Sequence, residues 1–179
     1  MYLDNFHSHF VQLQEYFPEK VKPCTEEQVL SLEKLCGLLL PAAYKEFLLW
    51  GGIWAGGFLV GIDFDYDDDM YQLRESLEEV LKQEEFPYPL PEDAFVFNAH
   101  QGYIFWFFKT SDGEDPPVYG YKEGSEPEPF NPISFRRISS SVSQFFLEEL
   151  EAEDRSIQQM LEREKMHVLS SIYSNNYNF

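Results

Sequence analysis

The sequence predicts a single α+β domain in which a mixed or antiparallel twisted sheet is flanked by N-terminal and C-terminal helices. Helical apolar spacing and capping residues occur near both ends, while short aromatic runs bounded by turn residues occupy the middle. A length of 179 residues suits one domain, and 44% hydrophobic residues suit a packed core. We divide the chain into an N-terminal helical extension (1–24), a core domain (25–150), and a C-terminal helical extension and tail (151–179).

Two helices are expected before residue 40. Apolar residues over 6–17 recur at near-helical spacing and predict a short leading helix that ends near Pro18. Thr25 then has the features of an N-cap, with Gln28 completing a capping box, and Gly37 ends the second helix. The apolar face of this second helix is assigned to Leu32, Leu35, Cys36 and Leu39.

A third helix is expected over residues 40–52, forming a helical hairpin with the second. Pro41 suits the first helical position, where the missing N–H costs nothing and φ is already set. Gly51 and Gly52 are expected to supply a left-handed exit at the C-terminus.

The region after this hairpin is expected to hold a buried strand and a fourth helix. Residues 58–62 are apolar and predict the strand. The acidic run 63–69 then leads into a helix whose buried stripe begins at Met70, because aspartates are favoured at a helix N-terminus. That helix stops before Pro87.

Three strands are expected next, over residues 94–98, 103–108 and 118–121, with a tight turn at 100–102 between the first two. The run 103–108 is apolar on both faces and predicts a central strand. One face should pack on helices, and the other either meets a further layer or lines an aromatic groove. We favour packing, since buried aromatic side chains usually belong to the core.

A last helix is expected after the serines 139–141, which can cap its N-terminus. Its apolar stripe continues weakly through Ile157, Leu161 and Val168, which predicts that the helix runs on beyond the domain.

The formal net charge is −19, from 32 acidic and 13 basic residues. Such a surface repels phosphate backbones and anionic lipids, so we expect neither nucleic-acid nor membrane binding. The charge serves either solubility or the steering of a basic protein partner. The uncharged stretch 47–62 is too short for a bilayer span and contains five glycines. An N-terminus without a basic region and two cysteines without a pairing pattern predict a cytoplasmic, reduced protein.

The candidate catalytic and metal-binding motifs are weak. The run 63–69 has aspartates at alternate positions like a calcium loop, but Asp68 occupies the glycine position and Arg74 that of the bidentate glutamate. Neither Cys24 nor Cys36 has a base or orienting partner nearby in sequence. We therefore expect no enzyme activity, no metal and no cofactor.

Four sequence blocks follow one another in a recognisable order. They are Thr25-Glu26-Glu27 with Glu33, Leu40-Pro41 through Gly51-Gly52, Leu90–Phe97 leading to Gly102–Phe105, and Pro117–Tyr121 followed by the helix containing Ser141, Phe145 and Phe146. Their succession resembles the SUKH superfamily, which includes bacterial immunity proteins and fungal glucan-synthesis regulators. The resemblance covers roughly residues 25–150, and the chain departs from it at Ala99-His100-Gln101-Gly102, where the family often has an Asp-Gly-like pair, and in the tail after Leu150.

The resemblance implies a non-catalytic binding protein, with two functions in view. The first is an immunity protein that neutralises a secreted or contact-delivered bacterial toxin, its partner being a basic toxin domain such as a nuclease or deaminase. The alternative is an intracellular regulatory scaffold with host protein partners. We expect a monomer or weak homodimer. The predicted partner-binding residues are an exposed aromatic and an acidic cluster: Trp54, Asp63, Asp65, Tyr66, Asp67, Asp68 and Asp69. For Trp54, capping of the core is an equal alternative.

Overall fold

The structure is a computed structural model, and it describes residues 1–60, 70–128, 131 and 133–176. Within these residues the chain forms one α+β domain with an antiparallel sheet between helices, which confirms the predicted fold class. The elements are α1 (Asp4–Gln12), α2 (Glu26–Cys36), α3 (Ala42–Gly51), the 3-10 turn η1 (Met70–Gln72), α4 (Leu73–Gln83), β1 (Ala94–His100), β2 (Ile104–Lys109), the 3-10 turn η2 (Thr110–Asp112), β3 (Val118–Lys122), β4 (Arg136–Ser139) and α5 (Val142–Asn176).

The sheet is a four-stranded meander in the order β1-β2-β3-β4, with every neighbouring pair antiparallel. A bulge between Val96 and Asn98 shifts the register of β1 against β2. A second irregularity lies between Val118 and Tyr119, where β3 meets β4. Among the described strands, β1 and β4 are therefore the two edges of the sheet.

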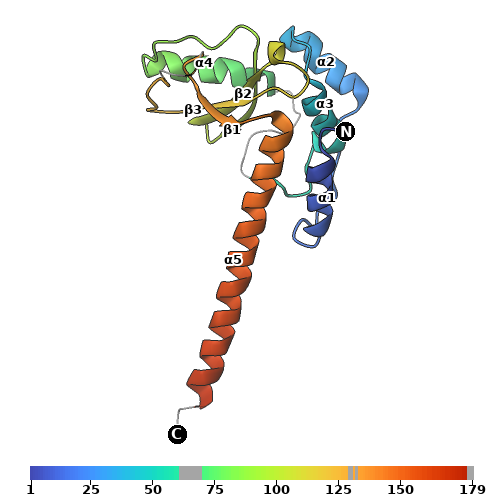
Figure 1. Cartoon of the computed structure of the whole chain (residues 1–179), viewed down its shortest axis with the longest axis vertical. Coiled ribbons are helices and arrows are strands. Elements are labelled where there is room, and N and C mark those ends of the chain that lie inside the picture. Colours follow the sequence, from blue (N-terminus) through green and yellow to red (C-terminus); the bar gives the residue numbers. More distant parts are fainter. Residues whose placement is uncertain (61–69, 129–130, 132, 177–179) are drawn as a thin grey trace.

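Both faces of β2 are covered, which confirms that it is a central strand and that its second face packs against another layer. On one face, Phe108 joins a buried cluster with residues of α1, α2, α3 and α5. On the other face, Phe105 and Phe107 pack with Leu77 and Leu81 of α4. Figure 1 shows α4 on one side of the sheet, with α1 and α3 beside the first turns of α5.

Several acidic side chains cap helices from a distance in sequence. Glu46 of α3 accepts hydrogen bonds from the Tyr2 and Leu3 amides, at 2.8 and 3.1 Å, where α1 begins. Glu114 accepts from the Ala42 amide at the start of α3, at 2.9 Å. These carboxylates satisfy amides that a helix N-terminus leaves without partners, and the helix dipole favours a negative charge there. Part of the acidity is therefore structural.

The predicted second helix has its caps where they were expected. The Thr25 hydroxyl accepts a hydrogen bond from the Gln28 amide at 3.2 Å, and the Gln28 side chain accepts one from the Thr25 amide at 2.8 Å. Gly37 ends the helix in the left-handed conformation, with φ of 68°. The capping box and the glycine stop are both confirmed.

The left-handed exit predicted at Gly51 and Gly52 is wrong. Gly51 is the last residue of α3, and Gly52 has right-handed helical angles, φ −67° and ψ −24°. The glycine at 52 is needed for space instead, because a Cβ there would lie 2.7 Å from the Cys24 sulfur and 2.8 Å from the backbone of Leu48.

The strand predicted from residue 58 is also wrong where the structure describes it. Residues 56–60 form turns, and Gly56, Gly57 and Leu59 all have positive φ, which a strand cannot accommodate. Phe58 and Leu59 are nonetheless buried. The apolar run therefore reflects burial within a turn. Residues 61 and 62 lie outside the described part.

Two further boundaries differ from expectation. The leading helix ends at Gln12 instead of near Pro18, because the amides of Leu13 and Gln14 bond to carbonyls three residues back and tighten the chain into turns. Strand β4 has no counterpart in the prediction, since its alternation is broken by two successive arginines. Helix α5 does begin after the serines, and the Ser141 hydroxyl accepts from the Gln144 amide at 3.1 Å.

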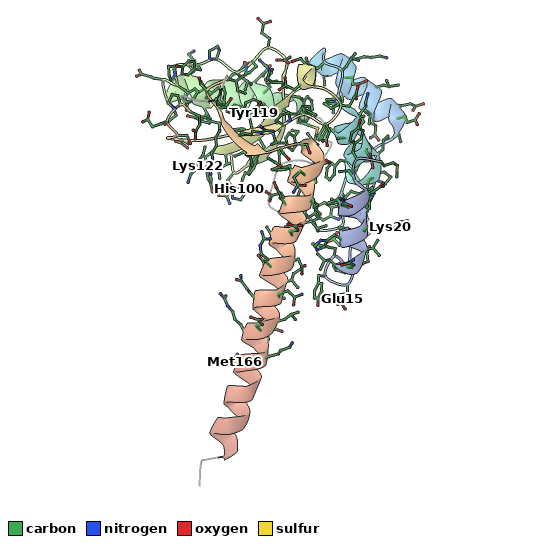
Figure 2. All side chains as sticks on the ribbon, viewed as in Figure 1. Glu15, Lys20, His100, Tyr119, Lys122 and Met166 are labelled. Atoms are coloured by element: carbon green, nitrogen blue, oxygen red, sulfur yellow. The ribbon has the colours of Figure 1, made fainter. Side chains whose placement is uncertain are left out.

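Helix α5 extends far beyond the packed body, as the apolar stripe of the sequence predicts (Figure 1). His9 of α1 lies 3.2 Å from Asp154 of α5, where the two helices run side by side. Figure 2 shows Met166 on the projecting part of α5, clear of the body. Met160 and Met166 of this helix are thus exposed to solvent in the isolated chain, at 49% and 66%.

Candidate functional site

The predicted partner-binding residues divide between one that the structure places and six that it does not. Trp54 is half-buried, and its backbone pairs with that of Lys22 through hydrogen bonds of 2.8 and 3.1 Å. Its indole nitrogen is buried and has no hydrogen-bond partner among the described residues. Asp63, Asp65, Tyr66, Asp67, Asp68 and Asp69 lie outside the described residues. A partner-binding role for these seven residues stays a prediction.

A groove of about 210 Å³ lies between α2 and α4, along the start of β1. We call it the α2–α4 groove. Met70, the first described residue after the acidic run, belongs to its wall. The groove is lined by Leu35 and Cys36 at the end of α2 and Leu38 just after it, Met70, Arg74 and Glu75 from η1 and α4, Glu92, and Ala94, Phe95 and Val96 of β1.

The α2 side of the groove is apolar and open to solvent. Leu35 is 61% exposed, and the neighbouring Leu39 is 79% exposed. This corrects the predicted apolar face of α2, whose buried positions are Val29, Leu32 and Glu33. Apolar residues cover more than one face of this helix, so their spacing alone could not decide which face meets the core. The exposed leucines are a surface on which a partner can bury apolar area.

The α4 side of the groove is acidic. Glu75 and Glu92 line it and are exposed, and the charge of Arg74 is neutralised by an ion pair with Glu78 at 2.8 Å. The outer surface of α4 carries further exposed glutamates, with Lys82 as an exposed base among them. The further glutamates are Glu78 and Glu79 on α4 and Glu84 and Glu85 directly after it. The groove therefore combines an apolar wall with a negatively charged one.

Arg74 also holds the edge of the sheet that forms the floor of the groove. Its guanidinium donates to the carbonyl oxygens of Ala94 and Pro91, at 2.8 and 3.1 Å. Arg74, which stands at the position of the bidentate glutamate of a calcium loop, is thus a structural clamp between α4 and β1. A cation there opposes metal binding by the acidic run.

Cys36 in the groove and Cys24 in the core are both poorly suited to nucleophilic chemistry. Burial raises the pKa of the Cys36 thiol, so this side chain stays protonated at neutral pH and is a poor nucleophile. Burial likewise raises the pKa of Cys24 to about 11. Across the part of the chain that the structure describes, no three histidine, cysteine or carboxylate side chains gather as metal ligands would. In that same part, no helix is both long and apolar enough to cross a membrane.

A second, larger hollow of about 400 Å³ lies where β3 and β4 separate. Its rim carries Lys122 and Arg136 as well as Glu126 and Glu128, so the opposite charges balance. This hollow has no preference for a charged partner. The α2–α4 groove, where Glu75 and Glu92 face one ion-paired arginine, has the more negative lining of the two.

The sequence profile of the SMI1/KNR4 family (SUKH-1) matches residues 23–148, well over half of the chain. The chain belongs to the SMI1/KNR4 family. Among curated protein sequences, none is similar enough to this SUKH-1 protein to count as a match. The resemblance read from the four sequence blocks is thereby confirmed, and members of this family are generally non-catalytic. All of the described groove lies within the matched region.

Sequence reasoning missed the groove because its parts are far apart in the chain. The exposure of Leu35 depends on which side of α2 meets the core, and the acidic wall depends on where α4 crosses β1. The apolar residues at 29, 32, 35 and 36 fit one helical stripe, so their spacing did not separate the exposed Leu35 from the core positions. Only Leu30, which lies outside the groove, falls off that stripe.

Proposed function

We propose that this SUKH-1 protein neutralises a cognate bacterial toxin by direct binding in the cytoplasm, and that the α2–α4 groove is its contact surface. The observation that carries the proposal is the exposed Leu35 in a groove whose other wall is acidic. Family membership supports it, since immunity is one of the roles found in this family. Binding blocks the toxin by covering its active surface, without any chemical step.

The charge distribution favours a basic partner, such as a nuclease or deaminase domain. A net charge of −19 attracts a basic domain over long range and raises the association rate, most strongly at low salt. Affinity then comes from a few well-buried contacts, for which the leucines of α2 are suited. The acidic run 63–69 directly precedes Met70 of the groove in the sequence, so its aspartates suit the same basic partner.

Coexpression tests this function. The protein is produced together with the C-terminal domain encoded by the neighbouring upstream gene, and growth rescue and co-purification are scored. We expect rescue together with a stoichiometric complex. A well-folded protein that neither rescues growth nor forms a complex would reject the immunity role.

A matched pair of variants tests the groove. Leu35→Glu places a carboxylate on the apolar wall, whereas Leu30→Glu makes the same change at a 53% exposed position of α2 that lies outside the groove. Losing a buried leucine contact should weaken the complex about tenfold or more, and the control should change its affinity less than about twofold. Equal effects of the two variants would show that the contact surface lies elsewhere on the protein.

The second candidate is a regulatory scaffold with several protein partners. The projecting half of α5 favours it, because a long exposed helix offers a separate surface beside the matched domain. A scaffold should bind partners through α5 that the groove variant leaves unaffected. Pull-down with a chain truncated after Arg155 would separate the two surfaces.

A further inference from the structure

The α2–α4 groove has room for one long side chain. Its volume of about 210 Å³ lies below the roughly 300–1,000 Å³ of pockets that hold whole small molecules. The floor is closed by residues that are almost fully buried, among them Met70 and Phe95. A partner can therefore fill the groove with a single side chain that enters from the protein surface.

The α2 side of the groove suits the methylene stem of such a side chain. Leu35 is largely exposed and Leu38 is half-buried, so both leave apolar surface in contact with water in the isolated chain. The stems of lysine and arginine side chains pack on surfaces of this kind while their charged ends stay in water. A long side chain with an apolar stem is thus a better match to this wall than a short polar one.

The α4 side of the groove offers two carboxylates without a counter-charge. Glu75 of α4 and Glu92, which precedes β1, are both exposed, and neither carboxylate has a hydrogen bond or ion pair to a described residue. Arg74 lines the groove as well, but its guanidinium already bonds to the Ala94 carbonyl and to the Glu78 carboxylate, each at 2.8 Å. Both groove carboxylates can therefore accept a cation from a partner.

We propose that the α2–α4 groove captures one arginine side chain of the partner, with its stem on Leu35 and its guanidinium held by Glu75 and Glu92. The inference rests on the proposed function and names the side chain that the contact surface recognises. Arginine fits better than lysine because the two carboxylates come from different parts of the chain. A planar guanidinium with several N–H donors can bond to both at once, whereas an ammonium acts as a point charge.

Capture of an arginine would also help to block the partner. Proteins that act on nucleic acids hold phosphate groups with arginine side chains, because the guanidinium matches the phosphate oxygens. An arginine bound by Glu75 and Glu92 is no longer available to a phosphate. Binding and inhibition of a nuclease would then follow from the same contact.

A set of small probes tests the recognition on the full chain. The probe is N-acetyl-arginine amide, and its matched controls are the lysine, citrulline and norleucine analogues. Citrulline keeps the shape of arginine without the charge, and norleucine keeps only the stem. Binding is followed by amide NMR of the isotope-labelled protein at low salt, where exposed charges are screened least. We expect saturable shifts at Leu35, Glu75 and Glu92, about threefold weaker binding of the lysine analogue, and at least fivefold weaker binding of the other two.

Matched variants of the protein locate the site. Glu75→Gln and Glu92→Gln each remove one charge from the groove, and Glu79→Gln removes the same charge from an exposed position of α4 outside it. Each groove variant should weaken binding of the arginine probe about threefold, the double variant about tenfold, and Glu79→Gln less than about 1.5-fold. The three single variants have the same net charge, so a difference between them comes from position and not from overall attraction.

Three results would overturn the proposal. These are an absence of saturable shifts in the groove at tens of millimolar arginine probe, equal affinity for the citrulline analogue, and equal weakening by Glu75→Gln and Glu79→Gln. The last would indicate attraction by the net charge of −19 alone. Growth rescue in the coexpression test together with any of them would leave the immunity role standing and reject only arginine capture. A failed rescue with a positive probe result would do the reverse.

Discussion

The two edges of the sheet prevent uncontrolled strand pairing in different ways. β4 is exposed and carries two successive arginines, Arg136 and Arg137, on an edge of only four residues. Short, charged edges resist pairing with other chains. β1 is longer and apolar, and its edge lies between α2 and α4 with Arg74 bonded across its start. A charged edge repels other strands, whereas an edge whose residues are buried is shielded from them.

The largest expected difference between the two edges is in the free energy of unfolding that is lost when Arg74 or Arg137 is replaced. Arg74→Met leaves the Ala94 and Pro91 carbonyls without their donor and breaks the ion pair with Glu78, and we expect a loss of about 2 kcal/mol. Arg137→Met removes only two long hydrogen bonds, a part-buried one of 3.4 Å to the Ser139 carbonyl and an exposed one of 3.2 Å to the Ser140 carbonyl, and should cost about 0.5 kcal/mol or less. Urea unfolding followed by circular dichroism measures both. Equal losses would contradict a structural clamp at β1.

The β4 edge can be loosened through its neighbour Gly120. A Cβ at this position would lie 2.8 Å from Cγ1 of Ile138, which crosses over β3. We expect Gly120→Val to displace Ile138 and destabilise the protein by about 1–2 kcal/mol. Thermal unfolding measures the change, and the double variant Gly120→Val with Ile138→Ala provides the control. If removing the Ile138 side chain does not recover most of the loss, another contact is responsible.

Asp93, just before β1, should make a small, pH-dependent contribution to the free energy of unfolding. Burial raises the pKa of this carboxyl, but hydrogen bonds from Ser111 outweigh it, and the net shift is below the ordinary 3.8. A lowered folded-state pKa stabilises the protein above 3.8, and this contribution is lost as the pH falls through the folded-state value. Asp93→Asn should therefore cost about 0.5 kcal/mol at neutral pH. The difference in melting temperature should shrink in acid; a constant difference would exclude an electrostatic origin.

The elements that were predicted well have their signals within a few residues. The capping box of Thr25 and Gln28, the stop at Gly37 and the serine cap before α5 each depend on neighbouring backbone groups. The central strand β2 was predicted because apolar residues on both faces require two covering layers, and both are present. Such signals need no knowledge of the rest of the chain.

The errors occur where one local pattern is compatible with several structures. The apolar run at Phe58 and Leu59 suited a strand, but neighbouring glycines place it in buried turns. Leu35 had helical spacing with the core residues, yet it faces solvent. Acidic residues such as Glu46 and Glu114 also could not be assigned as helix caps, because the amides they bind are tens of residues away.

The fold class, the family, the central strand and the overall negative charge could all be predicted from the sequence alone, since each depends on residue order or composition. Tertiary structure decided which leucines of α2 remain exposed, which glutamates form the opposite wall, and that the start of β1 lies between them. Those properties arise where α2, α4 and β1 meet. The packing of segments distant in sequence determines them, and no local pattern of residues encodes that packing.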